Sequence, residues 1–335
     1  MINICVIGCG QWGSNHIRNF SNLPGSQVVA VADLDENRLK QISKQYPNAT
    51  IQRNYIRLLE KEDIDAIVVA TPTKSHYKIT RDALEAGKHV LCEKPLCQTV
   101  EEGEEIVALA EKKGLILMVG HVFLFNPGIL KLKQMLGDIG KIYYLSATRT
   151  NLGPIRSDVN SVHDLASHDI SIFNFLLDSL PLEVSAVGMS FLQKGVEDVS
   201  FISMKYPNDI LTNIEVSWLN PKKVRQITIV GDEKMATWDD LANIGPVMVF
   251  DKGVLKESYY KDYGEFQLLA REGDAVIPRV RMEEPLRIQA EYFLSCLEKG
   301  FIEISDGRSG LNVIRVITAA IKSISMGGHP VQVEY

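Results

Sequence analysis

The chain contains no long hydrophobic run and no block of basic residues. Apolar stretches such as Ala66–Ala70 and Ile116–Gly120 are far shorter than the roughly 20 residues that a membrane-spanning helix needs. Lys and Arg together number 36 against 42 for Asp and Glu, a net charge of -6, whereas general nucleic-acid binding needs a positive surface. The sequence therefore argues against a membrane protein and against a nucleic-acid-binding protein.

Cysteine is scarce, with five residues and no C-x-x-C pair, which is typical of reduced thiols in a cytosolic protein. The first residues enter a strand pattern at once and lack the basic start, long apolar stretch and cleavage site of a signal peptide. His163 and His168 lie five residues apart and do not form the H-E-x-x-H pattern of zinc enzymes. We therefore expect a cytoplasmic protein that binds no metal ion.

The 335 residues correspond to about two domains at roughly 150 residues each. Up to about residue 120, short β-branched runs alternate with amphipathic stretches, which predicts a parallel sheet with helices on both faces. After Phe125, strand-like segments follow one another with short turns, which favours an antiparallel sheet. We predict an α/β protein with a Rossmann doubly wound parallel sheet in residues 1–122, and a C-terminal α/β domain with a mostly antiparallel open sheet in residues 123–335.

The periodicity also predicts individual elements. The strands expected in the first half are Ile2–Ile7, Gln27–Ala32, Ala66–Ala70, His89–Cys92 and Ile116–Val119, and the helices are Asn15–Phe20, Glu36–Gln45, Ser75–Ala86 and Val100–Lys113. The strands expected in the second half are Lys141–Thr150, Glu183–Val187, Ser200–Tyr206, Leu211–Trp218, Gln226–Val230 and Val247–Val254, and the helices are Val162–Leu177, Leu286–Lys299 and Gly310–Ser325.

Residues 8–13 read Gly8-Cys9-Gly10-Gln11-Trp12-Gly13 and join a predicted strand to a predicted helix. This is the context of a dinucleotide-binding G-x-G-x-x-G motif. Gly8 permits the tight turn, Gly10 lets the backbone approach a pyrophosphate at the helix N-terminus, and Gly13 allows close helix–strand packing. We expect this segment, with Gln11 and Trp12, to bind the cofactor.

Asp33 ends the second predicted strand, 20 residues after Gly13. A carboxylate there can accept hydrogen bonds from the adenosine ribose hydroxyls and would repel a 2′-phosphate. Arg38, close by in the chain, could instead pair with such a phosphate or stack on adenine. The sequence predicts NAD as the preferred cofactor and leaves the use of NADP open.

Two further segments follow predicted strands, at the edge where doubly wound sheets bind their ligands. Thr71-Pro72 comes after the third strand, with His76 on the next helix, and Glu93-Lys94-Pro95 comes after the fourth. A lysine held between a strand end and a proline can project into the cofactor crevice, where burial and nearby cations lower its pKa and suit it to proton transfer. An ordinary surface lysine is the alternative.

With these motifs, and with Gly120-His121, Asn126-Pro127 and the segment 164–169, the sequence resembles the glucose-fructose oxidoreductase, inositol dehydrogenase and rhizopine-catabolism (Gfo/Idh/MocA) family of oxidoreductases. The resemblance covers most of the chain in the right order. It implies that the cofactor site also includes Thr71, Pro72, His76, Glu93 and Lys94.

In that family, the lysine of the Glu-Lys-Pro motif and the Asp and His of an Asp-x-x-x-His helix surround the hydroxyl that is oxidised. The resemblance implies Lys94, Asp164 and His168 as the catalytic residues. Positions i and i+4 lie on one helix face, so both side chains can point into one cleft, although a surface pair is the alternative. A His with a pKa near 6.5 can accept the alcohol proton. We expect His168 as general base, Lys94 as hydrogen-bond donor and Asp164 as orienting group, and the order of proton movement between Lys94 and His168 stays open.

Within the family, the segments 149–158, 163–169 and 217–225 resemble bacterial and archaeal UDP-sugar 3-dehydrogenases. Those enzymes oxidise the C3 hydroxyl of UDP-N-acetylglucosamine or its uronic acid, and a PLP-dependent aminotransferase then makes a 3-amino sugar. The resemblance implies a nucleotide-sugar substrate and an aminotransferase as pathway neighbour. Its substrate-binding residues would be Arg149, Asn151, Arg156 and His168, with Lys222 and Arg225 as further cations for a diphosphate or carboxylate.

His163 departs from this pattern, because the UDP-sugar enzymes more often carry an aromatic residue before the aspartate, and the shape of the sugar pocket is therefore in question. His121 follows a strand and could border the nicotinamide pocket. The resemblance also implies a homodimer or homotetramer. An inositol, polyol or free-sugar dehydrogenase of the same family and a non-catalytic nucleotide sensor are the alternatives to a UDP-sugar dehydrogenase.

Overall fold

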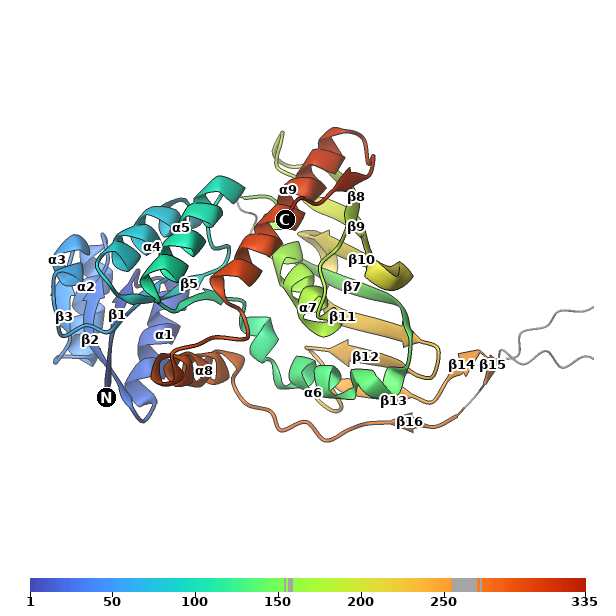
Figure 1. The fold of residues 1–335 in the computed structure, drawn as a ribbon, viewed down its shortest axis with the longest axis horizontal. Helices are drawn as coiled ribbons and strands as arrows, with labels where there is room; N and C mark the ends of the chain where they lie inside the picture. The colour runs from blue at the N-terminus through green and yellow to red at the C-terminus, as the bar shows by residue number, and fades with distance from the viewer. Residues whose placement is uncertain (154, 156–158, 255–269, 272) are drawn as a thin grey trace, which may run out of the picture. The chain divides into compact units, whose positions relative to one another are not determined.

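The computed structural model describes residues 1–153, 155, 159–254, 270–271 and 273–335 (Figure 1). Its contacts divide the chain into two units, Met1–Phe125 with Glu283–Thr318, and Asn126–Met282 with Ala319–Tyr335. A sequence boundary at residue 122 places Glu283–Thr318 in the second domain, whereas these residues pack with the first unit. The physical reason is a return of the chain: Phe293 packs edge-on against Phe20 at 6.2 Å between ring centroids.

The first unit contains a six-stranded parallel sheet with the order β3-β2-β1-β4-β5-β6. Its strands are β1 (Ile2–Ile7), β2 (Ser26–Ala32), β3 (Thr50–Gln52), β4 (Ala66–Val69), β5 (His89–Glu93) and β6 (Leu117–Gly120). Its helices are α1 (Gln11–Asn22), α2 (Glu36–Gln45), α3 (Ile56–Leu59), η1 (Thr73–Ser75), α4 (His76–Glu85), α5 (Val100–Lys113), η2 (Val122–Phe125), α8 (Pro285–Lys299) and the first part of α9 (Gly307–Ser325).

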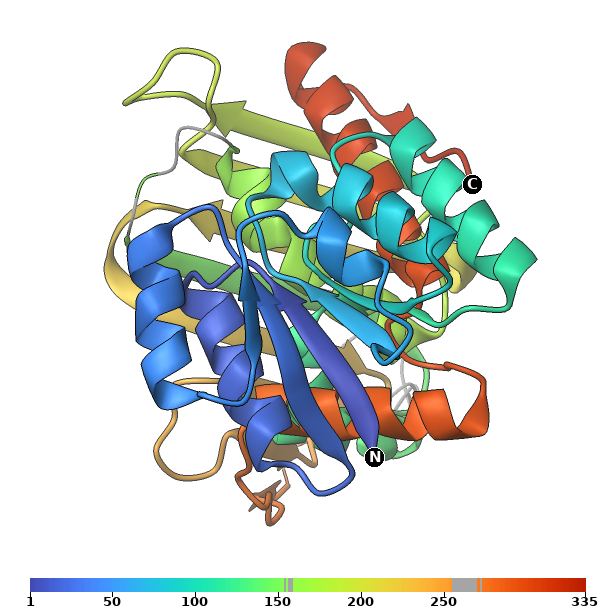
Figure 2. The same cartoon turned by 90° about the vertical axis from the view of Figure 1, so that its left-hand side faces the viewer.

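The strands of this sheet are buried on both faces, as parallel sheets covered by helices are. All four residues of β4 are buried, and Figure 2 shows helices on both sides of the strands. The strand order reverses between β1 and β4, which is the point where doubly wound sheets bind ligands beyond the carboxyl ends of their strands. The predicted Rossmann doubly wound sheet is confirmed.

The second unit contains a nine-stranded sheet with the order β16-β13-β12-β11-β7-β10-β9-β8-β17. Its strands are β7 (Ile142–Leu152), β8 (Glu183–Met189), β9 (Val199–Tyr206), β10 (Ile210–Ser217), β11 (Leu219–Gly231), β12 (Met235–Asp239), β13 (Val247–Phe250), β16 (Ala275–Val276) and β17 (Val331–Gln332). A separate pair joins β14 (Gly253–Val254) to β15 (Ala270–Arg271). The helices are α6 (Pro127–Met135), η3 (Leu136–Ile139), η4 (Val162–Ala166), α7 (Ser167–Leu177), η5 (Pro207–Asp209) and the end of α9.

In this sheet β7 and β10 are parallel, and the other described pairs are antiparallel. The predicted mostly antiparallel sheet is therefore confirmed. Burial alternates along β9, where Ile202 and Met204 are fully buried while Phe201 is 48% exposed, so one face of the sheet is covered and the other is open. The end of α9 contributes to the second unit, since Ser323 Oγ accepts a 2.8 Å hydrogen bond from Ala186 N.

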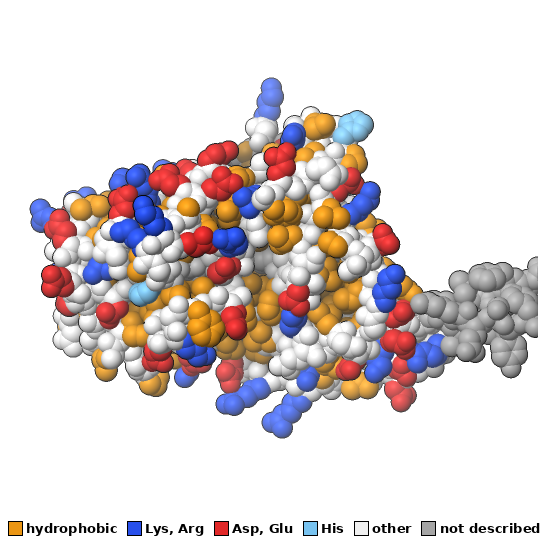
Figure 3. All heavy atoms as spheres, in the orientation of Figure 1, with side chains coloured by type: hydrophobic (Ala, Val, Ile, Leu, Met, Phe, Trp, Pro, Cys, Tyr) orange, Lys and Arg blue, Asp and Glu red, His pale blue; other side chains and the backbone are white. Residues whose placement is uncertain are grey.

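The surface in the view of Figure 3 carries acidic and basic side chains interspersed with one another. None of the helices in the described part of the chain is long and apolar enough to cross a membrane.

Candidate active site

The loop between β1 and α1 is shaped by its glycines. Gly8 has φ +97°, and a Cβ on it would lie 2.5 Å from the carbonyl oxygen of Ala70. A Cβ on Gly13 would lie 1.8 Å from the carbonyl oxygen of Gly8, so the packing of the protein itself requires these two glycines. A Cβ on Gly10 would meet only Arg38 Nη1, at 3.7 Å. The protein therefore does not fill the space in front of Gly10, and a cofactor could approach the backbone closely there.

The N-terminus of α1 is open to an anion. Gly10 is its N-cap and offers no side-chain hydrogen bond, and the first turn holds no acidic residue. The first N–H groups of the helix are thus available to the pyrophosphate of a dinucleotide. Gln11 is exposed and Trp12 is 44% exposed, so both side chains of the motif are on the surface of this unit.

Asp33 follows β2 and is held by two backbone groups. Cys9 N donates to Oδ2 at 2.5 Å, and Asp35 N donates to Oδ1 at 2.8 Å. Arg38, about half exposed, lies 4.0 Å from Asp33 Oδ2 and 3.4 Å from Asp35 Oδ2. The carboxylate is therefore fixed beside the glycine loop. This arrangement fits the adenosine ribose of NAD, whose hydroxyls donate to such a carboxylate.

The loops after β4 and β5 come together through His76, which is 1% exposed. Its Nε2 lies 2.7 Å from the carbonyl oxygen of Thr71, and its Nδ1 lies 2.7 Å from that of Pro95. Thr71 Oγ1 also accepts a 2.8 Å hydrogen bond from Ser75 Oγ. Both ring nitrogens of His76 are thus engaged by the backbone, and the ring braces the two loops that hold the predicted cofactor residues.

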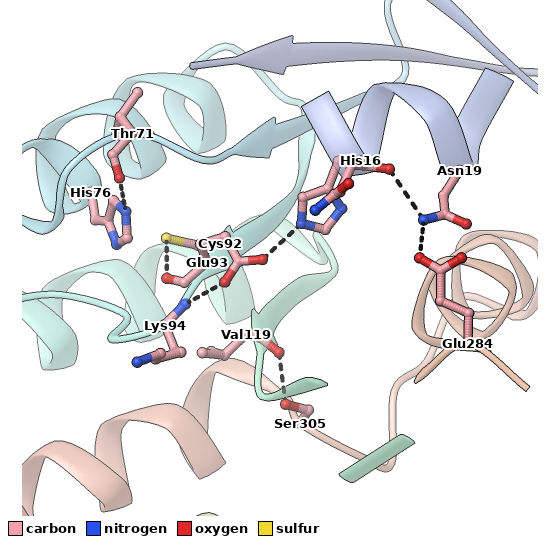
Figure 4. A network of polar contacts seen from close by, with 11 residues as sticks. His16, Asn19, Thr71, His76, Cys92, Glu93, Lys94, Val119, Glu284 and Ser305 are labelled. Carbon is pink, nitrogen blue, oxygen red and sulfur yellow. Dashed lines mark hydrogen bonds and ion pairs between the residues drawn. The ribbon is translucent and has the colours of Figure 1, made fainter. Parts of the chain in front are cut away.

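The Glu-Lys-Pro segment is anchored to α1 by a buried pair (Figure 4). His16 Nε2 lies 2.7 Å from Glu93 Oε1, with His16 fully buried and Glu93 7% exposed. The other carboxylate oxygen accepts from Lys94 N at 3.3 Å, and a Cβ on Gly120 would lie 2.9 Å from it. Sequence reasoning missed His16 as a partner of Glu93, because the two residues are 77 positions apart.

His121 follows β6 and is 2% exposed. Neither of its ring nitrogens has a hydrogen-bond partner among the described residues. Burial, and next the charge of Lys94, lowers the pKa of His121 to about 3. The ring is therefore neutral and close enough to Lys94 to feel its charge, and it holds one donor and one acceptor that the described protein does not use.

In the second unit, Asp164 lies in η4 and His168 lies in α7. The sequence predicts one regular helix over Val162–Leu177, but Ser167 N bonds to the carbonyl oxygen of Val162, so the first turn is a π-turn. Such turns occur often at functional sites. Asp164 Oδ2 accepts a 3.2 Å hydrogen bond from Trp218 Nε1, which fixes one member of the predicted catalytic pair.

The helix α7 is joined to β7 by a buried ion pair. Arg149 Nε and Nη2 donate to the two carboxylate oxygens of Asp169, each at 2.8 Å. The two side chains are only 4% and 2% exposed. Asp169 directly follows His168, so this bidentate contact fixes the part of α7 that carries the predicted base. Arg149 was predicted to contact the substrate. In the structure its guanidinium binds Asp169 and so holds α7 in place.

Residues 2–121 match the model of the oxidoreductase family with an NAD-binding Rossmann fold, and residues 129–237 match the model of the GFO/IDH/MocA C-terminal domain. The chain belongs to the Gfo/Idh/MocA family of oxidoreductases. Its first unit is accordingly an NAD-binding Rossmann domain, which agrees with the open Gly10 and the fixed Asp33 carboxylate.

The family members that the chain resembles differ in substrate. Inositol 2-dehydrogenase 2 of Paenarthrobacter aurescens is 30% identical over 100% of this chain and 99% of its own. The UDP-N-acetylglucosamine 3-dehydrogenase of Acidithiobacillus ferrooxidans is 28% identical over 71% of this chain and 74% of its own. The solved structure of that enzyme has a TM-score of 0.83, with 24% identity, and covers 98% of this chain and 99% of that chain.

The other residues predicted to bind the substrate are Asn151, at the end of β7, and Lys222 and Arg225, in β11. Arg156, which was also predicted, lies outside the described residues. Thr150 Oγ1 donates to the carbonyl oxygen of Lys222 at 3.2 Å, which sets an exposed lysine next to the strand end that carries Asn151. Arg225 Nη1 donates to Asp240 Oδ2 at 2.9 Å, so that cation has a carboxylate partner.

His163, the departure from the UDP-sugar pattern, is held by Asn160. Its Nδ1 lies 2.8 Å from Asn160 Oδ1, and Asn160 Nδ2 donates to Glu197 Oε2 at 2.7 Å. Because Asn160 Oδ1 can only accept, His163 Nδ1 carries the proton. Burial lowers the pKa of His163, against the opposing effect of Glu197, so the ring is neutral.

Proposed function

We propose that the chain is an NAD-dependent dehydrogenase of a secondary sugar alcohol, and that it oxidises the C3 hydroxyl of a UDP-N-acetylhexosamine or its uronic acid to the 3-keto sugar. The observation that carries this proposal is the exposed Lys222 beside the end of β7. A cation there suits a diphosphate or a carboxylate, and an uncharged polyol would not need it. The relative named UDP-N-acetylglucosamine 3-dehydrogenase supports the same substrate class.

The reaction moves a hydride and a proton. NAD, which the glycine loop and the Asp33 carboxylate would hold, would supply the hydride acceptor for the carbinol carbon. In the proposal, the imidazole of His168 accepts the hydroxyl proton as the carbonyl double bond forms. In the same proposal, Lys94 donates a hydrogen bond to the oxygen of the reacting hydroxyl and stabilises the negative charge that develops on it. Asp164, held by Trp218, orients the substrate or the other two side chains.

The second candidate function is oxidation of inositol or another free polyol. It is favoured by the relative named inositol 2-dehydrogenase 2, which is 30% identical over the full length of this chain. In that case Asn151 would bind only hydroxyl groups, and Lys222 would have no ligand role.

Titration of the purified protein with NAD and each of UDP-N-acetylglucosamine, its uronic acid and inositol separates the two functions. A UDP-sugar that raises the melting temperature by mass action and produces NADH supports the proposal. NADH production with inositol alone overturns the substrate class.

His168→Gln should abolish turnover while leaving NADH binding unchanged, and Lys222→Gln should raise KM for a UDP-sugar without changing kcat. Full turnover in the His168 variant would remove it from the proposed mechanism.

We also propose that the open face of the second unit's sheet binds a second copy of the chain. Exposed apolar side chains pair across neighbouring strands on this face, Tyr144 with Leu211 and Val187 with Phe201, and each is 43% to 51% exposed. Such a cluster favours association. Phe201→Glu should convert the oligomer to a monomer in light scattering, whereas Leu241→Glu, on the turn after β12, should not. A wild-type monomer would overturn the proposal.

A further inference from the structure

One buried side chain, His76, ties together two loops at the carboxyl edge of the first unit's sheet; Figure 4 shows its contact with Thr71. His76 is the first residue of α4. Its Nε2 lies 2.7 Å from the carbonyl oxygen of Thr71, after β4, and its Nδ1 lies 2.7 Å from the carbonyl oxygen of Pro95, after β5. The imidazole therefore spans the loops that follow two neighbouring parallel strands.

The chemistry of the two partners fixes the protonation of the ring. Both are carbonyl oxygens, which only accept hydrogen bonds. A neutral imidazole has a single N–H, so it would satisfy one oxygen and turn a nitrogen lone pair toward the other. An imidazolium has an N–H on both nitrogens and satisfies both oxygens. We infer that His76 is a buried imidazolium that clamps the Thr71-Pro72 turn to the Lys94-Pro95 turn, and so positions both turns for the cofactor.

The surroundings of the ring contain effects of both signs. Burial lowers the pKa of His76, but its interactions with Cys92 and with the carbonyl oxygens of Pro95 and Thr71 outweigh burial and raise the pKa to about 9. The N-terminus of α4 opposes a cation in its first turn. Two charge-assisted hydrogen bonds in a buried site are the stronger effect.

The clamp is a positioning device. Because the backbone engages both nitrogens and the ring is buried, His76 acts on the cofactor through the turns it holds. Lys94 precedes Pro95 directly, so the same contact also fixes the backbone of the predicted catalytic lysine. A fixed positive charge at this edge further favours the phosphates of a dinucleotide. The inference rests on the NAD-binding unit and does not depend on which substrate is oxidised.

The protonation state can be measured directly. In protein labelled with ¹⁵N-histidine, long-range ¹H–¹⁵N correlation spectra at neutral pH should show protons on both ring nitrogens of His76, with the signals assigned by their loss in His76→Gln. The exposed His329 provides a reference ring on the protein surface. A His76 ring with one unprotonated nitrogen would overturn the inference, whatever the activity of the enzyme.

The positioning role needs a binding measurement with a matched control. His89 begins β5 at the opposite edge of the sheet, and its Nδ1 accepts one backbone hydrogen bond, from Ile116 N at 3.0 Å. NADH fluorescence titration should show affinity weakened by about tenfold or more in His76→Gln and by less than about twofold in His89→Gln, because only the first loses preorganised cofactor loops. Equal affinities in the two variants would overturn the positioning role. If His76→Gln does not fold, variants at the other histidines assign the remaining ring signals, and the wild-type signals left over, those of His76, still decide its protonation state.

Discussion

Replacing Asp169 by Asn should strongly destabilise the second unit. The carboxylate is 2% exposed and binds the 4% exposed guanidinium of Arg149 in a bidentate pair. Asp169→Asn removes the negative charge and leaves the buried cation without its bidentate carboxylate. Breaking a buried ion pair from one side costs about 3–5 kcal/mol, a large fraction of the roughly 5–15 kcal/mol that stabilises a typical domain.

The chain provides a matched control on the same helix. Asp178, the C-cap of α7, pairs with Lys133 at 2.5 Å, but its side chain is 80% exposed. Asp178→Asn should cost less than about 1 kcal/mol, as exposed pairs do, and Asn tolerates the left-handed backbone there. Both variants make the same chemical change, so the difference between them measures the effect of burial.

Urea unfolding followed by tryptophan fluorescence measures this difference. Trp218 and Trp238 are each 1% exposed in the second unit, so they report on its unfolding. The double variant Arg149→Met with Asp169→Leu should recover most of the loss, because the cost comes from the unpaired buried charge and not from the absence of the pair. Equal midpoints for Asp169→Asn and Asp178→Asn would refute the reasoning.

Three further perturbations test the cofactor edge of the first unit. Gly10→Ala should weaken NADH binding at an unchanged melting temperature, whereas Gly13→Ala should lower the melting temperature, because its Cβ would lie 1.8 Å from a carbonyl oxygen. A melting temperature lowered equally in both variants would contradict this. Asp33→Ala should relax the preference for NAD over NADP in kcat/KM, and an unaltered ratio would place the ribose contact elsewhere. The pKa of His121 is lowered to about 3, so the unfolded state binds more protons below pH 6.5 and stability should fall by about 1.4 kcal/mol per pH unit from there toward pH 3. His121→Asn should reduce this slope, and identical slopes would count against the buried neutral ring.

The sequence predicts the elements whose ends carry local chemical signals. The predicted helix Glu36–Gln45 matches α2, where the Asp35 side chain accepts hydrogen bonds from the N–H groups of residues 37 and 38. The predicted helix Val100–Lys113 matches α5, which Thr99 caps and Gly114 ends with φ +63°. These caps are side-chain and glycine effects that depend on neighbouring residues alone, so they can be recognised without a fold.

Elements without such signals were not predicted. The three-residue strand β3 (Thr50–Gln52) is too short to show a period, and β12 (Met235–Asp239) is defined by pairing with β11 and β13. The π-turn before α7 differs from an α-helix only in its hydrogen-bond register, which a pattern of apolar residues does not reveal. The family resemblance, and not propensity, implies that the helices Leu286–Lys299 and Gly310–Ser325 return to the first domain, because this packing spans more than 150 residues of intervening chain.

The candidate site shows the same division between local and long-range information. The glycine loop and Asp33 are recognisable because their spacing follows from one βαβ unit. The three buried histidines at the carboxyl edge are distinguished by partners from distant segments: His16 faces a carboxylate, His76 faces two carbonyl oxygens, and His121 meets no hydrogen-bond partner among the described residues. Residue type alone would give the three rings the same role. His16 is engaged by the Glu93 carboxylate and His76 by two backbone carbonyl oxygens, whereas His121 is the ring of the three with neither nitrogen hydrogen-bonded among the described residues.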